Sequence, residues 1–124
     1  MSRVDVSILY FNFGVKAVKP SYTNFDEFYV DYLLEHRKPV NRALHLFGTL
    51  SSVAWITTVV SFRLGPMFWL LALVIGYGPS WVGHFFIEKN RPATFRYPLK
   101  SLMGDFRMAF DILRNRRLLF EKSS

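Results

Sequence analysis

The chain has 124 residues, of which 51% are apolar, 18% are aromatic and only 20% are charged. This length fits one domain, over residues 1–124, since compact domains usually have about 50 to 250 residues. Disordered chains are poor in apolar and aromatic residues, so disorder is excluded. The chain contains no cysteine, which excludes disulfide scaffolds, thiolate metal sites and cysteine nucleophiles. A soluble protein of this size would have difficulty burying so much apolar surface.

The net charge of +7 at first suggests nucleic-acid binding, because clustered lysine and arginine are typical of phosphate binders. The distribution of the charge argues against it. Six of the 16 basic residues lie before residue 43 and nine lie after residue 88, and only Arg63 lies between them. This distribution is typical of a protein held in a bilayer. We therefore expect membrane lipids as partners and no nucleic acid.

The N-terminal part of the chain contains one predicted helix. Residues 1–20 show no helical period, and we interpret them as a surface arm. Cap-type residues over positions 21–24 then precede an amphipathic helix over residues 24–36, with two acidic residues in its first turn. Pro39 marks its boundary, because the residue before a proline is disfavoured in a helix.

Two apolar segments follow, over residues 43–62 and 64–87, each with a single ionisable residue, His45 or His84. Each has about the 20 residues that are needed to cross the hydrocarbon of a membrane. The connection at Arg63 is so short that the two helices must run antiparallel, as a hairpin. Small residues that allow close packing form one face of the first helix: Gly48, Ser51, Ser52 and Ala54.

The second apolar segment contains Gly76-Tyr77-Gly78-Pro79, which predicts a break or kink, since proline removes a helical hydrogen bond. Residues 99–119 predict a basic amphipathic helix at the membrane interface. The predicted fold is therefore all-α, a multi-pass membrane protein with a central hairpin between amphipathic helices. Basic residues at both outer ends place both termini in the cytoplasm, and the protein in the inner membrane if its source is a bacterium.

Counting residues to the turn predicts where the two histidines lie. His45 lies 18 residues before Arg63 and His84 lies 20 residues after Leu64, roughly 27 Å and 30 Å along a helix. The two imidazoles are therefore expected at nearly equal depth. Asn41 and Glu88 lie four residues from His45 and His84, each on the same helix face as its histidine. His36 and Asp105 are further candidates, from the ends of the flanking helices.

Two neutral imidazoles and a carboxylate suit ferrous iron in oxygenases. The same ligands suit zinc with a hydrolytic water, and the spacing alone does not choose between the two metals. Simpler interpretations also remain open. His45 and His84 can be structural residues near helix ends, Glu88 can be a charge at a helix end, and Asn41 can be a helix cap.

The segments HRKPVNRALHLFG, GHFFIEKNRPATFRYP and SLMGDFRM resemble the membrane family named for the metabolism of phytosphingosine to odd-numbered fatty acids. The resemblance extends from about Phe25 to Met108. Its motifs are the helix that ends in His36, the N-x-x-x-H pair Asn41 and His45, and the G-H-x-x-x-E block that contains His84 and Glu88.

This resemblance implies an iron(II)-dependent dioxygenase of alpha-oxidation, which shortens a 2-hydroxy fatty acid by one carbon and releases carbon dioxide. It implies His36, His45 and His84 as metal-site histidines, and Glu88 as a ligand or a neighbour of the ligands. The substrate's tail would lie between the helices, and its carboxylate and 2-hydroxyl would reach the iron. The remaining candidates for substrate binding are Asn41, Arg37, Arg42 and Arg91, since arginine pairs with carboxylates in a bidentate manner.

Three other hypotheses remain open. The first is a membrane scaffold or lipid-binding protein without enzymatic activity, in which the histidines are structural. The second is a zinc-dependent lipid hydrolase with Glu88 as general base. The third is a soluble helical domain with a buried hairpin.

Overall fold

The computed structural model describes residues 22–121, and every element in this range is helical, which confirms the predicted class. The expected arm over residues 1–20 lies outside the described residues. In chain order the elements are the α-helices α2 (Phe25–Leu34), α3 (Pro39–Ser61) and α4 (Pro66–Val82), the π-helix η1 (Gly83–Glu88), the 3₁₀-helix η2 (Ala93–Phe95), α5 (Pro98–Arg114) and the 3₁₀-helix η3 (Arg116–Leu119).

Two helix boundaries differ from the expected ranges. α3 begins at Pro39 rather than at residue 43, because a proline in the first turn lacks only an N–H that a helix leaves unused there. The range expected as one helix over 99–119 is divided at Asn115, whose backbone is extended. The Asn115 side chain accepts a hydrogen bond from the N–H of Arg117 (3.3 Å) and so begins η3.

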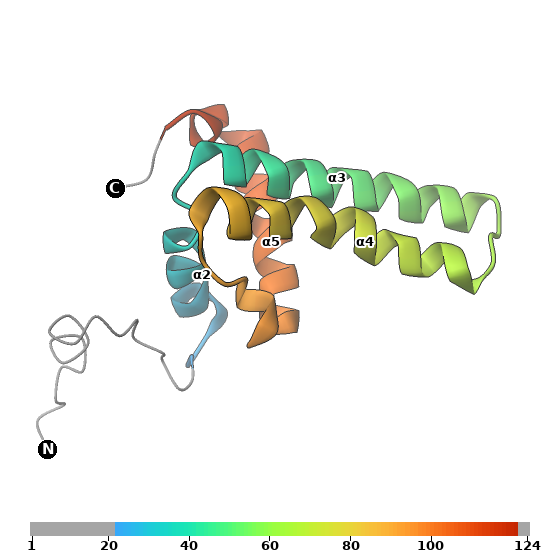
Figure 1. The fold of residues 1–124 in the computed structure, drawn as a ribbon, viewed down its shortest axis with the longest axis horizontal. Coiled ribbons are helices and arrows are strands. Elements are labelled where there is room, and N and C mark those ends of the chain that lie inside the picture. Colours follow the sequence, from blue (N-terminus) through green and yellow to red (C-terminus); the bar gives the residue numbers. More distant parts are fainter. Residues whose placement is uncertain (1–21, 122–124) are drawn as a thin grey trace, which may run out of the picture.

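α3 and α4 run side by side in opposite directions and are joined by residues 62–65 (Figure 1). We call these two helices the α3–α4 pair. Their backbones approach so closely at Gly48 that a Cβ atom there would lie 2.6 Å from the carbonyl oxygen of Gly76. One turn further, the Ser52 hydroxyl donates to the carbonyl of Ala72 (2.9 Å). Gly48 and Ser52 thus lie at the contact, whereas Ala54, from the same expected face, is exposed.

The register of the pair is constant along its length. Asn41 meets Gly83, Gly48 meets Gly76, and Ser52 meets Ala72, so each step along α3 is matched by an equal step along α4. This regular register continues past Pro79, and α4 is helical through it. The expected break at Gly76–Pro79 is therefore wrong, and the alternative, a kink, stays a prediction. The close contact with α3 holds the helix in place, and the Ser80 hydroxyl donates to the carbonyl of Gly76 (3.1 Å).

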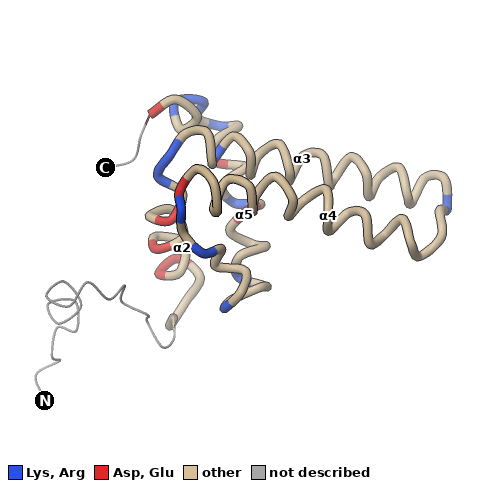
Figure 2. The backbone as a smooth tube through the Cα atoms, in the orientation of Figure 1, with Lys and Arg blue, Asp and Glu red and all other residues tan. Residues whose placement is uncertain are grey.

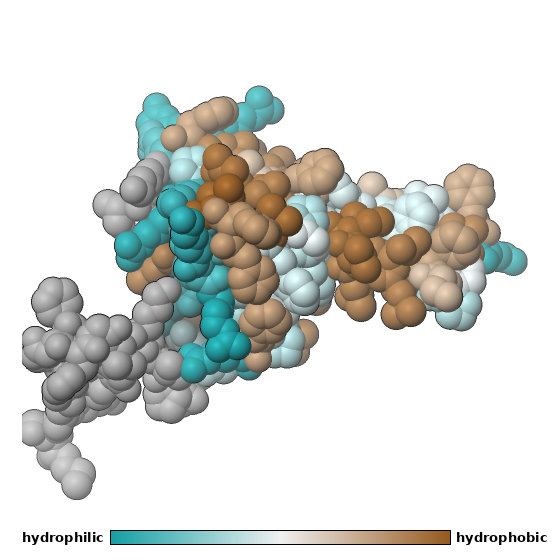
Figure 3. Space-filling view, viewed as in Figure 1, coloured by the Kyte–Doolittle hydropathy of each residue, from teal (hydrophilic) through white to brown (hydrophobic). Residues whose placement is uncertain are grey.

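The outer surface of the α3–α4 pair is apolar and exposed. Both Pro39–Ser61 and Pro66–Glu88 are long and apolar enough to cross a membrane, and only 17% and 22% of their most apolar windows are buried. The pair carries Arg63 at one end and several charged residues at the other end (Figure 2). Residues 43–62 and 64–87, which lie between these ends, contain no charged residue. In Figure 3 brown apolar side chains alternate with pale ones along the visible face of the pair, and strongly teal ones lie only toward its ends.

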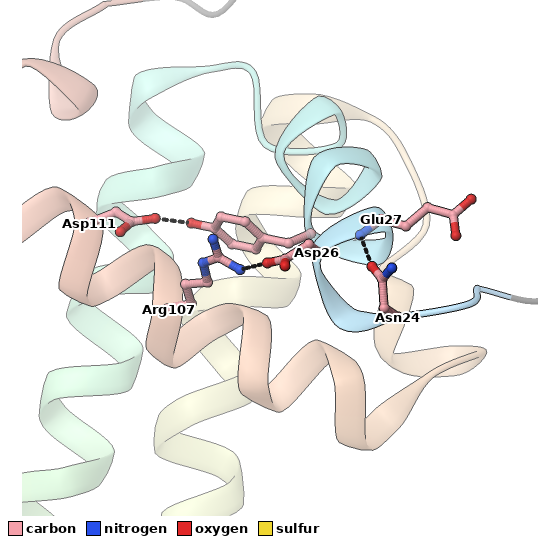
Figure 4. A network of polar contacts seen from close by, with 6 residues as sticks. Asn24, Asp26, Glu27, Arg107 and Asp111 are labelled. Atoms are coloured by element: carbon pink, nitrogen blue, oxygen red, sulfur yellow. Dashed lines mark hydrogen bonds and ion pairs between the residues drawn. The ribbon is translucent and has the colours of Figure 1, made fainter.

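α2 and α5 pack across the end of the pair that lies far from Arg63 (Figure 1). α2 begins at Asn24, whose side chain accepts a hydrogen bond from the N–H of Glu27 (2.9 Å), as its cap-type sequence predicts. The carboxylate of Asp26 on α2 forms an ion pair with the guanidinium of Arg107 on α5, with an N–O distance of 2.6 Å (Figure 4). The core between these two helices consists of Phe28, Tyr29, Tyr32, Met108 and Ile112.

The contact at Gly48 leads to a prediction about stability. Gly48→Ala places a methyl group against the backbone oxygen of Gly76, so the helices must separate, and we expect a loss of about 1 to 3 kcal/mol. Gly78→Ala is the matched control on α4, because no atom lies within 4 Å of its Cβ position. Thermal unfolding in detergent, followed by circular dichroism, should show a lower Tm for Gly48→Ala alone. Equal melting of the two variants would contradict the close contact.

Candidate metal centre

Three histidines from three segments meet where the α3–α4 pair joins α2 and α5. His36 lies in the connection after α2, His45 lies in the second turn of α3, and His84 lies in η1. Each has an exposed fraction of only 1 or 2%. One ring nitrogen from each histidine can be chosen so that all three lie within 4.8 Å of one another. Sequence analysis placed His45 and His84 together and named His36 as a further candidate, and the structure brings all three histidines together.

The imidazoles of His45 and His84 meet because their side chains lean toward each other. In the register of the pair His45 lies opposite Pro79, so His84 is five residues, or about 7.5 Å, further toward the end of the pair. Side chains of a helix tilt toward its N-terminus. Because the helices are antiparallel, the two rings tilt in opposite directions, and their centroids come within 4.8 Å. The equal depth that was expected is thus a property of the rings rather than of the backbone.

The hydrogen bonds of the three rings define their tautomers. The Nδ1 atom of His36 lies 2.6 Å from the carbonyl oxygen of Tyr32, and that of His45 lies 2.9 Å from the carbonyl oxygen of Asn41. The Nδ1 atom of His84 lies 2.7 Å from Oδ1 of Asn90. A carbonyl oxygen can only accept, so Nδ1 donates in each ring. Each Nε2 atom then carries no proton and has its lone pair free, which is the form that a histidine ligand requires.

The lone pairs converge in a way that suits a cation. Nε2 of His36 lies 3.0 Å from Nε2 of His45, and with both Nδ1 atoms protonated these are two acceptors facing each other. Burial, together with the neighbouring rings of His45 and His84, holds the pKa of His36 well below its usual range, so that this ring is neutral at pH 7. Neutral imidazoles are good ligands for Fe²⁺, Zn²⁺ and similar metals. The residues therefore fit a metal ion held by three nitrogens.

Asn90 holds His84 in place, and sequence analysis did not identify it. Lys89 adopts a left-handed conformation (φ 57°) and ends η1, which turns the chain back on itself. The backbone N–H of Asn90 then donates to the carbonyl of His84 (3.0 Å), and its side-chain amide donates to the carbonyl of Glu35 (3.0 Å). Asn90 thus connects His84 to the segment that carries His36. The polar loop in which it lies has no periodicity that would have identified it.

Glu88 is not brought into the histidine group. Its carboxylate accepts a hydrogen bond from the backbone N–H of Lys38, at the start of α3, and it is half-buried. The expectation that Glu88 shares a face with His84 assumed an α-helix. η1 is a π-helix, in which the wider turn removes the alignment of residues four apart. Within residues 22–121 the potential ligand set consists of three histidines without a carboxylate.

Asp105 lies one side chain away from the histidines. Its carboxylate accepts a hydrogen bond from the hydroxyl of Tyr32, whose ring stacks on the ring of His36 with centroids 4.0 Å apart. Burial raises the pKa of Asp105 to about 7, although the hydrogen bond from Tyr32 acts in the opposite direction. Burial and the nearby Asp105 carboxylate also raise the pKa of Tyr32. Tyr32 is a second residue of the centre that sequence analysis treated only as part of a helix face.

Asn41 is completely buried, and its side-chain amide has no hydrogen-bond partner within residues 22–121. It lies against Gly83, where a Cβ atom would come within 2.0 Å of its Oδ1. A buried amide without partners costs free energy, and such groups are uncommon in folded proteins. Asn41 is therefore a polar group beside the centre that is still able to bind.

The three candidate arginines differ in what they contact. The guanidinium of Arg42 donates to the carbonyls of His36 and Arg37 (3.0 Å each) and also to the carbonyl of Leu118. It therefore ties the connection after α2 to η3. Arg37 and Arg91 are exposed, and the Arg91 guanidinium lies 5.9 Å from the centre of the Phe95 ring.

Comparison with known proteins identifies the family. The family model described as 2-hydroxy-palmitic acid dioxygenase Mpo1-like matches residues 22–117, a range that contains all three histidines. No curated protein and no solved structure matches the chain significantly. The match covers most of the chain, and it confirms the family that the sequence motifs indicated. The chain belongs to the Mpo1-like family.

Proposed function

We propose that this chain is a membrane-embedded, Fe²⁺-dependent dioxygenase that shortens 2-hydroxy fatty acids by one carbon in alpha-oxidation. The main support is the convergence of three neutral imidazoles, each with its Nε2 lone pair free, in a chain of the Mpo1-like family. The family description names 2-hydroxy-palmitic acid as a substrate, and we extend this substrate class to the chain.

In this proposal His36, His45 and His84 hold the metal, and the tautomers described above present their Nε2 atoms to it. When bound, Fe²⁺ supplies Lewis-acid activation and a template for dioxygen. Three protein ligands leave other coordination positions for substrate and dioxygen. We assign Glu88 a supporting role in place of ligation, because its carboxylate accepts a hydrogen bond from the backbone N–H of Lys38, directly before α3.

We assign recognition of the substrate's polar end to Asn41 and to the exposed guanidiniums of Arg37 and Arg91. The buried amide of Asn41 can both donate to and accept from a 2-hydroxyl group. Arg37 directly follows His36, and Arg91 follows Asn90, so both lie in segments that flank ligands. Arg42 already donates to backbone carbonyls, and we assign it to holding these segments together.

The path of the substrate's tail differs from the first expectation. A tail between α3 and α4 would have to separate Gly48 from Gly76, whose backbones are in contact. We therefore propose that the acyl chain lies along the outside of the α3–α4 pair. Exposed apolar side chains are present there on both helices, including Phe47, Leu50 and Val74.

We also propose that both helices of the pair cross the membrane and that both termini lie in the cytoplasm. The charges at the end with the histidines are mostly basic, whereas the opposite end has Arg63 alone (Figure 2). α5 lies across the pair and exposes one apolar face, as an interfacial helix does: Leu99, Leu102, Met103, Phe106, Phe110 and Leu113.

The first test is metal content. Protein purified in detergent and loaded anaerobically with Fe²⁺ should retain metal, whereas His45→Ala and His84→Ala should lose most of it. Glu88→Gln is the control. It removes a carboxylate that lies at the same end of the pair as the histidines but is not a ligand in the proposed three-histidine site. Unchanged iron in both histidine variants would overturn the site, and loss of iron in Glu88→Gln would restore Glu88 as a ligand.

The second test is the requirement for dioxygen. Incubation of the Fe²⁺-loaded protein with 2-hydroxypalmitate in air should give a product shorter by one carbon, and the same mixture without dioxygen should give none. Mass spectrometry of the extracted lipids measures both. Turnover that persists without dioxygen would contradict the dioxygenase, and absence of turnover by metal-loaded protein indicates a lipid-binding role.

The third test concerns topology and uses the absence of native cysteine. Arg63→Cys should react with an impermeant maleimide added to intact cells, whereas Arg116→Cys should react only after the membrane is opened. Labelling of both variants in intact cells would contradict the proposed orientation. Extraction of the protein by carbonate would instead favour the soluble helical domain.

A further inference from the structure

Two tyrosines of α2 form matched hydrogen bonds to two aspartates of α5. The hydroxyl of Tyr29 donates to Asp111 at 2.6 Å, and the hydroxyl of Tyr32 donates to Asp105. The two tyrosine rings are stacked, with centroids 5.8 Å apart and an interplanar angle of 17°. Figure 4 shows Asp111 and Arg107 on α5, facing Asp26 on α2. Both pairs therefore hold the same two helices together.

Only one of these pairs continues to a histidine. Tyr32 contacts His36 in two ways, because its carbonyl accepts from Nδ1 (2.6 Å) and its ring stacks on the imidazole at 4.0 Å. The ring of Tyr29 contacts Phe25, Tyr32 and the Arg107 guanidinium. The two pairs are thus similar in chemistry and different in what they touch.

His36 needs such support more than the other two histidines do. His45 and His84 lie within helices, whereas His36 lies two residues beyond the end of α2, where its backbone N–H makes a last turn-like bond to the carbonyl of Leu33 (3.1 Å). The orientation of its ring therefore depends on its neighbours. Tyr32 provides a backbone acceptor for Nδ1 of His36, and its side chain provides a flat surface for the imidazole, so the position of the Tyr32 ring constrains the orientation of the His36 ring.

α5 is shaped to receive Tyr32. A Cβ atom at Gly104 would lie 2.9 Å from Cε2 of the Tyr32 ring, so only glycine allows the ring to lie this close to the helix. Tyr32 is 2% exposed. Asp105, the next residue along α5, then fixes the hydroxyl end of the ring.

We propose that Asp105, acting through Tyr32, positions His36 and thereby sets the affinity of the centre for its metal. This inference rests on the proposed metal site, and it gives α5 a part in that site. Outer hydrogen bonds that orient ligands typically change metal affinity about 10-fold to 100-fold. A purely structural α2–α5 bond would change stability and leave metal affinity unchanged.

The experiment uses the full chain in detergent with Co²⁺ as probe, and measures both the dissociation constant, by competition with a chelator, and the visible absorption spectrum. Tyr32→Phe and Asp105→Ala each remove the hydrogen bond. We expect each to weaken Co²⁺ binding about 10-fold and to change the spectrum. Asp105→Asn keeps an oxygen that can accept from Tyr32, so it should bind Co²⁺ nearly as the unmodified chain does.

Tyr29→Phe and Asp111→Ala are the matched controls, since they remove the equivalent bond between the same helices. They should lower the Tm by a similar amount and leave Co²⁺ affinity and spectrum unchanged. The proposal is overturned if Tyr32→Phe and Asp105→Ala bind Co²⁺ like the unmodified chain, if the controls weaken binding equally, or if Asp105→Asn binds as weakly as Asp105→Ala. If the unmodified chain binds no Co²⁺ or Fe²⁺, the metal site itself is wrong.

Discussion

The close contact of α3 and α4 at Gly48 and Gly76 is the constraint on which the rest of the structure depends. Because the backbones touch there, neither helix can slide or rotate without a clash. The resulting register brings His45 and His84 to positions from which their oppositely tilted rings meet. It also brings Gly83 against Asn41, which completes the polar group at this end of the pair. Two glycines outside the histidine group, about one turn from His45 and from the residue opposite it, therefore determine which side chains can form the centre.

A ligand set of three neutral imidazoles has a consequence for the choice of substrate. A divalent ion held by uncharged nitrogens keeps its full positive charge in a buried position, where charge is costly unless an anion joins it. A chelating 2-hydroxy acid provides such an anion. The absence of a carboxylate from the described ligand set thus favours an acidic substrate, and the proposed substrate class has this property.

The sequence predicted the parts of the site that depend on regular helices, and it missed the parts that depend on irregular backbone or on tertiary contacts. His45 and His84 were found by counting residues, because an α-helix advances by a constant rise. Glu88 was misplaced because η1 is a π-helix, and no pattern in the sequence reports the wider turn. Tyr32 bonds to Asp105 of α5 and Asn90 bonds to Glu35, and no local spacing encodes these contacts between segments, although Tyr32 lies only four residues before His36.

Asn41 suggests how binding of a substrate could be made favourable at such an enclosed centre. Leaving an amide buried without partners costs about 1 to 3 kcal/mol, and the packing of the pair must offset this cost in the folded chain. A ligand that satisfies the amide recovers that free energy, whereas an acid without a 2-hydroxyl group does not. Discrimination by an unsatisfied polar group is stronger than discrimination by apolar contact. Preference for 2-hydroxy acids over simple fatty acids would then arise at Asn41, and the metal would contribute affinity for the carboxylate that both classes share.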